Sequence, residues 1–283
     1  MCDSGRDDSD SRESVPTTPF HRWDGLPPGD PKTEVVLFIG SLGSQPSMWD
    51  LQVPAVAPHY SVLRCDIRGH GSSTVPKGPY SIDELVDDAE RLLDSLNIQV
   101  VHVVGLSLGG MIAMHLAATR PNRVKSLVAM CSSPFLPPRA EWLRRAHVVR
   151  TQGIEVMVDA IVGRWFTAKF AAANRLTVDI MRRMIASTPP EGYAACCEAI
   201  ANLDLRSELP SITAPTLVMG GKSDPSTPPS HSELIAELIP SARLALLDAA
   251  HLANVEAADD VNAEILRFLS SHQDHGVGRL SHP

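Results

Sequence analysis

Short apolar runs alternate with segments of helical periodicity along most of this chain. The runs are rich in Val, Ile and Leu and hold few polar residues, which is typical of strands covered on both faces of a sheet. They are residues 34–40, 61–67, 101–105, 124–131, 215–221 and 244–248. Helical patterns are found at residues 81–96, 111–117, 234–239 and 261–269. The alternation predicts an α/β fold with a mainly parallel, doubly wound sheet and right-handed crossovers.

Three stretches depart from this alternation. Between residues 134 and 209 only helical periodicity remains, over residues 142–149, 156–166, 178–185 and 193–201. We interpret residues 134–209 as a helical cap inserted into a core made of residues 20–133 and 210–272. Residues 1–19 are predicted to be a disordered acidic tail and residues 273–283 a flexible one.

Two local predictions concern the first part of the core. Residues 20–23 predict a short strand that is broken by residues 24–29. Farther along, Pro54 is predicted to kink or end a short helix through Trp49 and Leu51.

From Val101 to Gly110 the pattern changes from strand to helix through a five-residue turn, G-x-S-x-G. This context is typical of a nucleophile elbow, a strained turn that lifts a serine hydroxyl above the carboxyl edge of a sheet. Gly105 and Gly109 would let the strand and the helix approach closely. Ser107 is therefore the candidate nucleophile.

A serine hydroxyl needs a histidine base and a carboxylate that orients the imidazole. In α/β-hydrolases the chain order is nucleophile, acid, histidine, and Asp224 and His251 follow in that order. Each comes just after a predicted strand, so both can meet Ser107 at one edge of the sheet. His70 is the alternative base, but it precedes the serine. Asp248 is the alternative acid, but its position three residues before the histidine favours a role in the turn.

Acyl transfer also needs two N–H donors that stabilise a tetrahedral oxyanion. One is expected from the backbone of Leu108, just after the nucleophile. The other is expected from the loop after residues 34–40, where Leu42 is best placed.

Composition narrows the range of partners and compartments. The chain has 283 residues, 43% of them hydrophobic, and a formal net charge of −8 without a Lys/Arg cluster, which disfavours nucleic acid and membrane surfaces. Five cysteines without disulfide or metal spacing, and an N-terminus without an apolar signal, predict a cytoplasmic protein. No cofactor and no metal are expected, because no phosphate-binding glycine motif or ligand spacing occurs. The expected partner is a small molecule, and a homo-oligomer is left open.

Several stretches carry more specific motifs. D-I-R-G-H-G-S-S at residues 66–73, G-L-S-L-G-G-M at 105–111 and D-A-A-H-L-A-N-V-E at 248–256 are widespread among α/β-hydrolases. G-S-L-G at 40–43 with M-W-D at 48–50, R-W-F-T at 164–167 and P-E-G-Y-A-A-C-C at 190–197 are more telling. With these, the chain from Val35 onwards resembles the 3-oxoadipate enol-lactonases of aromatic catabolism. It departs at the front, where two antiparallel strands usual in the family have little room and residues 20–25 are expected to supply one.

The resemblance implies hydrolysis of a small five-membered enol-lactone that bears an acetate arm. Ser107 would open the ring to an acyl-enzyme, and His251 would protonate the leaving enolate oxygen. The same histidine would then activate water, which releases 3-oxoadipate. The alternatives are a broader carboxylesterase, a cofactor-free perhydrolase with the same three residues, and a non-catalytic small-ligand receptor of this fold.

An anionic substrate calls for a cation and an apolar wall in the cap. Trp142 and Arg145 lie one helical turn apart and are the predicted pair. Arg164 and Trp165 are the alternative pair.

Overall fold

The structure is a computed structural model that describes residues 18–26 and 33–273. The tails predicted at residues 1–19 and 273–283 lie almost entirely outside the described residues and stay predictions. Within the described ranges, no helix is both long and apolar enough to cross a bilayer.

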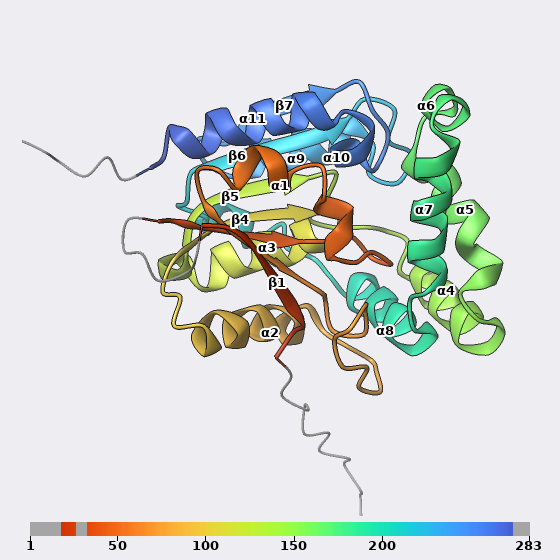
Figure 1. Ribbon diagram of the computed structural model, residues 1–283. Helices are drawn as coiled ribbons and strands as arrows, with labels where there is room; N and C mark the ends of the chain where they lie inside the picture. The colour runs from red at the N-terminus through yellow and green to blue at the C-terminus, as the bar shows by residue number, and fades with distance from the viewer. Residues whose placement is uncertain (1–17, 27–32, 274–283) are drawn as a thin grey trace, which may run out of the picture.

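A mostly parallel sheet lies at the centre of the fold (Figure 1). Its seven described strands are arranged in the order β1-β3-β2-β4-β5-β6-β7, and only the pairing of β1 with β3 is antiparallel. The strands are β1 (His21–Gly25), β2 (Val35–Ile39), β3 (Ser61–Cys65), β4 (Val101–Leu106), β5 (Val124–Met130), β6 (Thr216–Gly221) and β7 (Arg243–Leu247). The predicted α/β class and parallel sheet are confirmed.

The edge strand β1 runs farther than expected. The predicted break over residues 24–29 begins too early, because Asp24 and Gly25 stay paired with β3, and residues 27–29 lie outside the described residues. A buried arginine explains this continuation, since Arg64 Nε donates a hydrogen bond of 2.8 Å to Asp24 Oδ2. As expected for residues 20–25, the strand supplies one of the two antiparallel strands that are usual at the front of the enol-lactonases.

Helices cover both faces of the sheet (Figure 1). Helices α2 (Ile82–Ser95) and α3 (Leu108–Thr119) pack side by side on one face, and α1 (Val53–Val56) and α11 (Ala258–Ser270) lie on the other. The remaining core helices are α9 (Pro229–Leu238) and α10 (Ala253–Glu256), with 3-10 turns η1 (Pro46–Trp49), η2 (Pro121–Arg123) and η3 (Leu209–Ser211). Helix α2 begins at a capping box, in which the Ser81 hydroxyl accepts from Glu84 N–H and the Glu84 carboxylate accepts from Ser81 N–H.

Pro54 begins a helix instead of ending one. The predicted helix through Trp49 and Leu51 is split into η1 and the separate short helix α1, which has Pro54 in its first turn. That position needs no N–H donor and suits the fixed φ of proline. The prediction was wrong because a first-turn proline and a helix-ending proline look alike in sequence.

The segment between β5 and β6 is helical wherever the structure assigns it regular secondary structure. Its helices stand at the right of Figure 1, beyond the carboxyl ends of the strands. They are α4 (Arg139–Gln152), α5 (Glu155–Trp165), α6 (Ala168–Ala173), α7 (Arg175–Ala186) and α8 (Pro190–Ala201). The short helix α6 is not among the predicted segments. We keep the name cap for residues 134–209.

Helix α3 approaches the sheet very closely where it begins. A Cβ atom added to Gly109 would lie 2.2 Å from Ile39 O, and one added to Gly105 would lie 2.2 Å from Gly109 O. Both distances are far below van der Waals contact with backbone atoms that cannot move freely. Glycine at these two positions therefore lets the Ser107 turn sit directly on β2 and β4.

Replacing Gly109 by alanine is expected to lower the free energy of unfolding by about 1–3 kcal/mol or more, because the added methyl group overpacks rigid backbone. Gly163→Ala is the matched control, since nothing lies within 4 Å of a Cβ added there. In the interior of α5 this change should raise stability by about 0.5–1 kcal/mol. Urea unfolding of both variants measures the difference, and an unchanged Gly109→Ala protein would contradict the close approach.

Candidate active site

Ser107 occupies a strained turn between β4 and α3. Its φ of 57° and ψ of −114° lie in a region that residues with a side chain rarely adopt. The turn is held by backbone bonds, because Ser107 N–H donates to Met130 O at 2.9 Å and Ser107 C=O accepts from Met111 N–H at 3.0 Å. The Ser132 hydroxyl donates a further bond to the same carbonyl at 2.8 Å. The serine hydroxyl is thereby presented at the carboxyl edge of the sheet.

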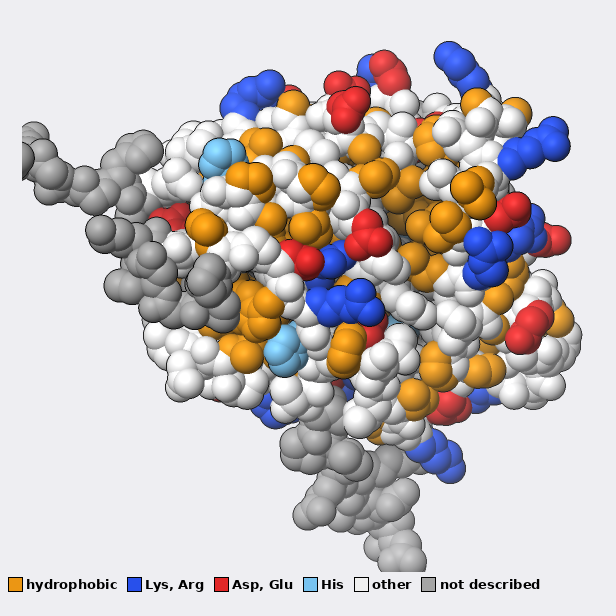
Figure 2. Space-filling view, in the orientation of Figure 1, with side chains coloured by type: hydrophobic (Ala, Val, Ile, Leu, Met, Phe, Trp, Pro, Cys, Tyr) orange, Lys and Arg blue, Asp and Glu red, His pale blue; other side chains and the backbone are white. Residues whose placement is uncertain are grey.

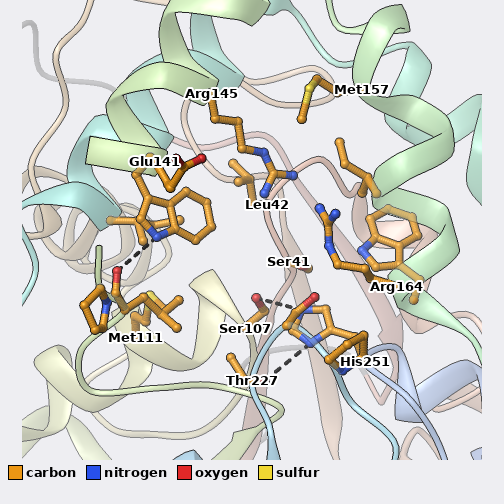
Figure 3. Close-up of a pocket in the computed structure, with 18 of the residues that line it drawn as sticks. Ser41, Leu42, Ser107, Met111, Glu141, Arg145, Met157, Arg164, Thr227 and His251 are labelled. Atoms are coloured by element: carbon orange, nitrogen blue, oxygen red, sulfur yellow. Dashed lines mark hydrogen bonds between the residues drawn. The ribbon is translucent and has the colours of Figure 1, made fainter. Parts of the chain in front are cut away.

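The structure brings together the three residues predicted from chain order, of which Figure 3 shows Ser107 and His251. His251 Nε2 lies 3.0 Å from Ser107 Oγ, and His251 Nδ1 lies 2.7 Å from Asp224 Oδ2. The loops after β6 and β7 supply the acid and the histidine. The rival acid Asp248 takes no part, because it is exposed and pairs with Lys222 at 2.7 Å.

The Asp224 carboxylate is fully enclosed and saturated with donors. Its Oδ1 accepts from Ser226 N–H at 2.7 Å and Thr227 N–H at 3.0 Å, and its Oδ2 also accepts from the Thr227 hydroxyl at 2.7 Å. Burial alone would raise the pKa of this carboxyl, but the charge of His251 and hydrogen bonds from His251 and Thr227 hold the pKa below its usual value. An ionised carboxylate only accepts, so the imidazole carries its proton on Nδ1 and leaves Nε2 for the serine proton.

Two backbone N–H groups beside Ser107 are available to an oxyanion. Leu108 begins α3, so helix geometry leaves its N–H without an intrahelical acceptor. In the loop after β2, Ser41 N–H donates to Met48 Sδ at 3.4 Å and Gly43 N–H donates to His70 Nε2 at 2.9 Å. Leu42 N–H, between them, has no acceptor among the described residues. Both predicted donors are therefore without an acceptor among the described residues, and Leu42 lines the same cavity as Ser107.

His70, the rival base in the sequence, supports this loop. It is completely buried and accepts from Gly43 N–H, while its Nδ1 lies 3.2 Å from Arg68 O. Burial lowers the pKa of His70 to about 4, so the imidazole is neutral at physiological pH and donates from Nδ1 to that carbonyl. The histidine of the Gly-flanked turn thus holds the loop that carries Leu42.

A cavity of about 320 Å³ opens above the serine between core and cap (Figure 3). Arg145 and Arg164 both line it, and their guanidinium groups face one another over Ser107. Trp142 and Trp165 line it too, so the predicted pair and its alternative belong to one pocket. The sequence could not show this, because α4 and α5 are brought together only by the folding of the cap.

The two arginines leave positive charge uncompensated. Neither forms an ion pair with an acidic residue in the described part of the chain, and the buried Nε of Arg145 has no hydrogen-bond partner there. Arg145 instead lies between the rings of Trp142 and Tyr193, 5.2 Å from each ring centre. Burial lowers the pKa of Arg164, and the charge of Arg145 lowers it further. An anion bound between them would relieve this repulsion.

Two contributors were missed at the level of sequence. Thr227 binds the acid through both its hydroxyl and its N–H. Its only signal was a hydroxyl residue three positions after an aspartate, which is also common in turns that have no catalytic role. In the sequence, Tyr193 is distinguished only as part of the P-E-G-Y-A-A-C-C motif. Its position against Arg145 depends on the packing of α8 on α4.

The described residues on the face of the molecule in Figure 2 show no large patch of positive charge comparable to the pocket. On the described part of the face in Figure 2, basic and acidic side chains are interspersed and do not gather into a patch of one sign. No group of three or more His, Cys, Asp or Glu side chains in residues 18–26 and 33–273 has the arrangement of a metal site.

Comparison with known proteins gives the class first. A family model described as alpha/beta hydrolase fold matches residues 34–153 and 175–258. The chain is therefore an α/β-hydrolase, in agreement with its sheet and its serine turn.

Similar proteins define the family of this chain within the α/β-hydrolases. The 3-oxoadipate enol-lactonase 2 of Acinetobacter baylyi is 35% identical over 234 residues, 83% of this chain and 88% of that protein. The structure of the enol-lactonase from Burkholderia xenovorans matches with a TM-score of 0.87 at 37% identity, covering 90% of this chain and 97% of that one. The chain belongs to the 3-oxoadipate enol-lactonase family, which confirms the resemblance drawn from motifs.

A relative with another named activity is also similar. RutD of Stutzerimonas stutzeri, named as a carbamate hydrolase, is 30% identical over 85% of this chain and 93% of that protein.

His70→Ala is expected to lower kcat by about 10- to 100-fold with little change in KM, because the freed loop no longer fixes the Leu42 N–H where the oxyanion forms. His102→Ala is the matched control. His102 is equally buried but bonds Ser126 and Glu34, away from the pocket. Steady-state kinetics on a para-nitrophenyl ester measures both. Equal losses of kcat in the two variants would mean that His70 acts only through general stability.

Proposed function

We propose that the protein is a serine hydrolase that opens 3-oxoadipate enol-lactone to 3-oxoadipate through an acyl-enzyme. The observation that carries the proposal is the pairing of a histidine-bonded serine with two uncompensated arginines in one cavity. The first feature supports acyl transfer, and the second supports a substrate that bears a carboxylate.

Acylation begins with attack of Ser107 Oγ on the lactone carbonyl carbon. His251 Nε2 accepts the hydroxyl proton across 3.0 Å, and the Asp224 carboxylate stabilises the resulting imidazolium. Negative charge develops on the carbonyl oxygen, where the N–H groups of Leu42 and Leu108 donate. These donors are fixed before the substrate arrives, so little reorganisation is needed during the reaction.

Collapse of the tetrahedral intermediate breaks the ring C–O bond. His251 returns its proton to the leaving enolate oxygen, and the leaving group remains attached because it belongs to the same molecule. Tautomerisation of the enol to a ketone removes the nucleophile that could close the ring again. Water, deprotonated by His251, then attacks the acyl carbon and releases free Ser107 and 3-oxoadipate.

The two cap arginines are proposed to bind the acetate arm. The Arg145 guanidinium lies 5.2 Å from the centres of two aromatic rings and Arg164 faces it, so a carboxylate can bind between the two guanidinium groups. Trp165 and Met157 provide apolar wall for the ring. This division of polar and apolar lining suits a small anion with a flat apolar body.

A second candidate is hydrolysis of a carbamate or of a broader range of esters. The similarity to RutD supports the carbamate, and the same three residues could serve either substrate. Placement in aromatic catabolism and in the cytoplasm remains part of the proposal. Comparing kcat/KM for the enol-lactone, generated in situ, with values for a simple carbamate and a neutral ester separates these candidates.

Ser107→Ala is expected to abolish labelling by a fluorophosphonate and to lower kcat by about 10⁶-fold, because the nucleophile is gone. Intact-protein mass spectrometry counts the label, and the expected stoichiometry for the unchanged protein is one per chain. A folded protein that neither labels at Ser107 nor turns over an ester would favour a non-catalytic receptor.

Arg145→Met and Arg164→Met are each expected to lower kcat/KM for para-nitrophenyl hydrogen adipate by about 10- to 100-fold, because a charge-assisted hydrogen bond is lost. The neutral ester para-nitrophenyl hexanoate has the same length and should change by less than about threefold. Steady-state kinetics on both esters measures the selectivity. If kcat/KM falls equally for both esters, the arginines shape the pocket but do not bind the carboxylate of the substrate.

A further inference from the structure

The loop that carries His251 is tied to the cap on both sides of the histidine. Leu252 N–H donates to Trp165 O at 2.9 Å. Ala250 N–H donates to the Glu256 carboxylate at 3.0 Å, and the same carboxylate accepts from Thr167 N–H at 3.1 Å. The connection from Leu252 to the cap is a direct hydrogen bond, whereas the connection from Ala250 is made through the Glu256 side chain. Both lead to the short cap segment, residues 165–167, between α5 and α6.

The Glu256 side chain bridges these segments through hydrogen bonds from neutral donors. It forms no ion pair with a Lys, Arg or His side chain of the described residues, and the donors it binds are neutral. The Thr167 hydroxyl accepts from Phe170 N–H at 3.2 Å, so its own hydrogen is directed to Glu256 Oε1. This donor set fits a carboxylate and not an amide, since the NH₂ group of a glutamine would face another donor.

The cap segment leads directly to the anion pocket. Arg164 immediately precedes it and points into the cavity over Ser107 (Figure 3). A chain of covalent and hydrogen bonds therefore runs from the guanidinium through residues 165–167 and Glu256 to the backbone around His251. The two ends of this chain are a proposed carboxylate site and the proposed base.

We propose that Glu256 is a positioning residue that couples a carboxylate bound at Arg164 to the orientation of His251. The proposal rests on the proposed function, because it takes Arg164 as a substrate contact and His251 as the base. An anion held by Arg164 restrains the cap segment, and Glu256 carries that restraint to Ala250, next to the imidazole. Binding energy from a distant part of the substrate is then used in the chemical step and raises kcat as well as affinity.

The test compares para-nitrophenyl hydrogen adipate with para-nitrophenyl hexanoate, which differ at the far end of the acyl chain. With the unchanged protein, kcat for the anionic ester should exceed kcat for the neutral one. Glu256→Gln should lower kcat for the anionic ester by about 10-fold, leave kcat for the neutral ester within about threefold, and change KM little. Asp259→Asn removes an exposed carboxylate nearby on α11 and should change neither.

Each other outcome overturns the coupling. Equal slowing of both esters by Glu256→Gln would mean that the carboxylate only keeps the histidine loop folded. Unchanged kinetics, or a wild-type kcat that does not depend on the distant carboxylate, would also refute it. If Glu256→Gln does not fold, Thr167→Val removes the hydroxyl donor from the cap side and is judged by the same criteria. If the protein is labelled at Ser107 but shows no such dependence, the proposed hydrolase function stands and the coupling is refuted. If the protein is not labelled, both proposals are refuted.

Discussion

A helix and a parallel sheet approach each other without side chains between them, and the remainder of the site depends on that approach. Gly105 and Gly109 leave only backbone at the contact, so the turn that joins β4 to α3 is forced into a positive φ at Ser107. The strain of about 1–3 kcal/mol expected for such a residue is borne by the buried strands around it. The same turn places both the proposed nucleophile, Ser107, and the proposed oxyanion donor, the N–H of Leu108, at one edge of the sheet.

The other groups of the proposed site are positioned by neighbouring side chains that have no proposed part in the reaction. Thr227 fixes the Asp224 carboxylate, and His70 fixes the loop of Leu42. The cap is bonded to this arrangement through α5, which carries Arg164 and ends at Trp165, because Trp165 O accepts a hydrogen bond from Leu252 N–H in the histidine loop. Preorganisation of this kind stabilises charge as it develops and does not depend on the movement of the catalytic side chains.

The sequence predicted the parts of the site that depend on local pattern and chain order. Ser107, Asp224 and His251 each follow a strong apolar run, and the parallel topology then requires them to meet. What the sequence could not predict depends on long-range packing: Arg145 and Arg164 share one pocket only because α4 and α5 fold over the sheet. His70 shows the same limit, since a glycine-flanked histidine is equally compatible with a base and with a buried hydrogen-bond acceptor.

The most direct test of the account is rapid quenching of the enzyme during turnover of the enol-lactone, followed by peptide mass spectrometry. Because the leaving oxygen stays within the acyl group, the peptide that holds Ser107 should carry the mass of the entire lactone. The adduct should be absent in Ser107→Ala. Turnover without any adduct, retained in Ser107→Ala, would contradict acyl transfer through this serine.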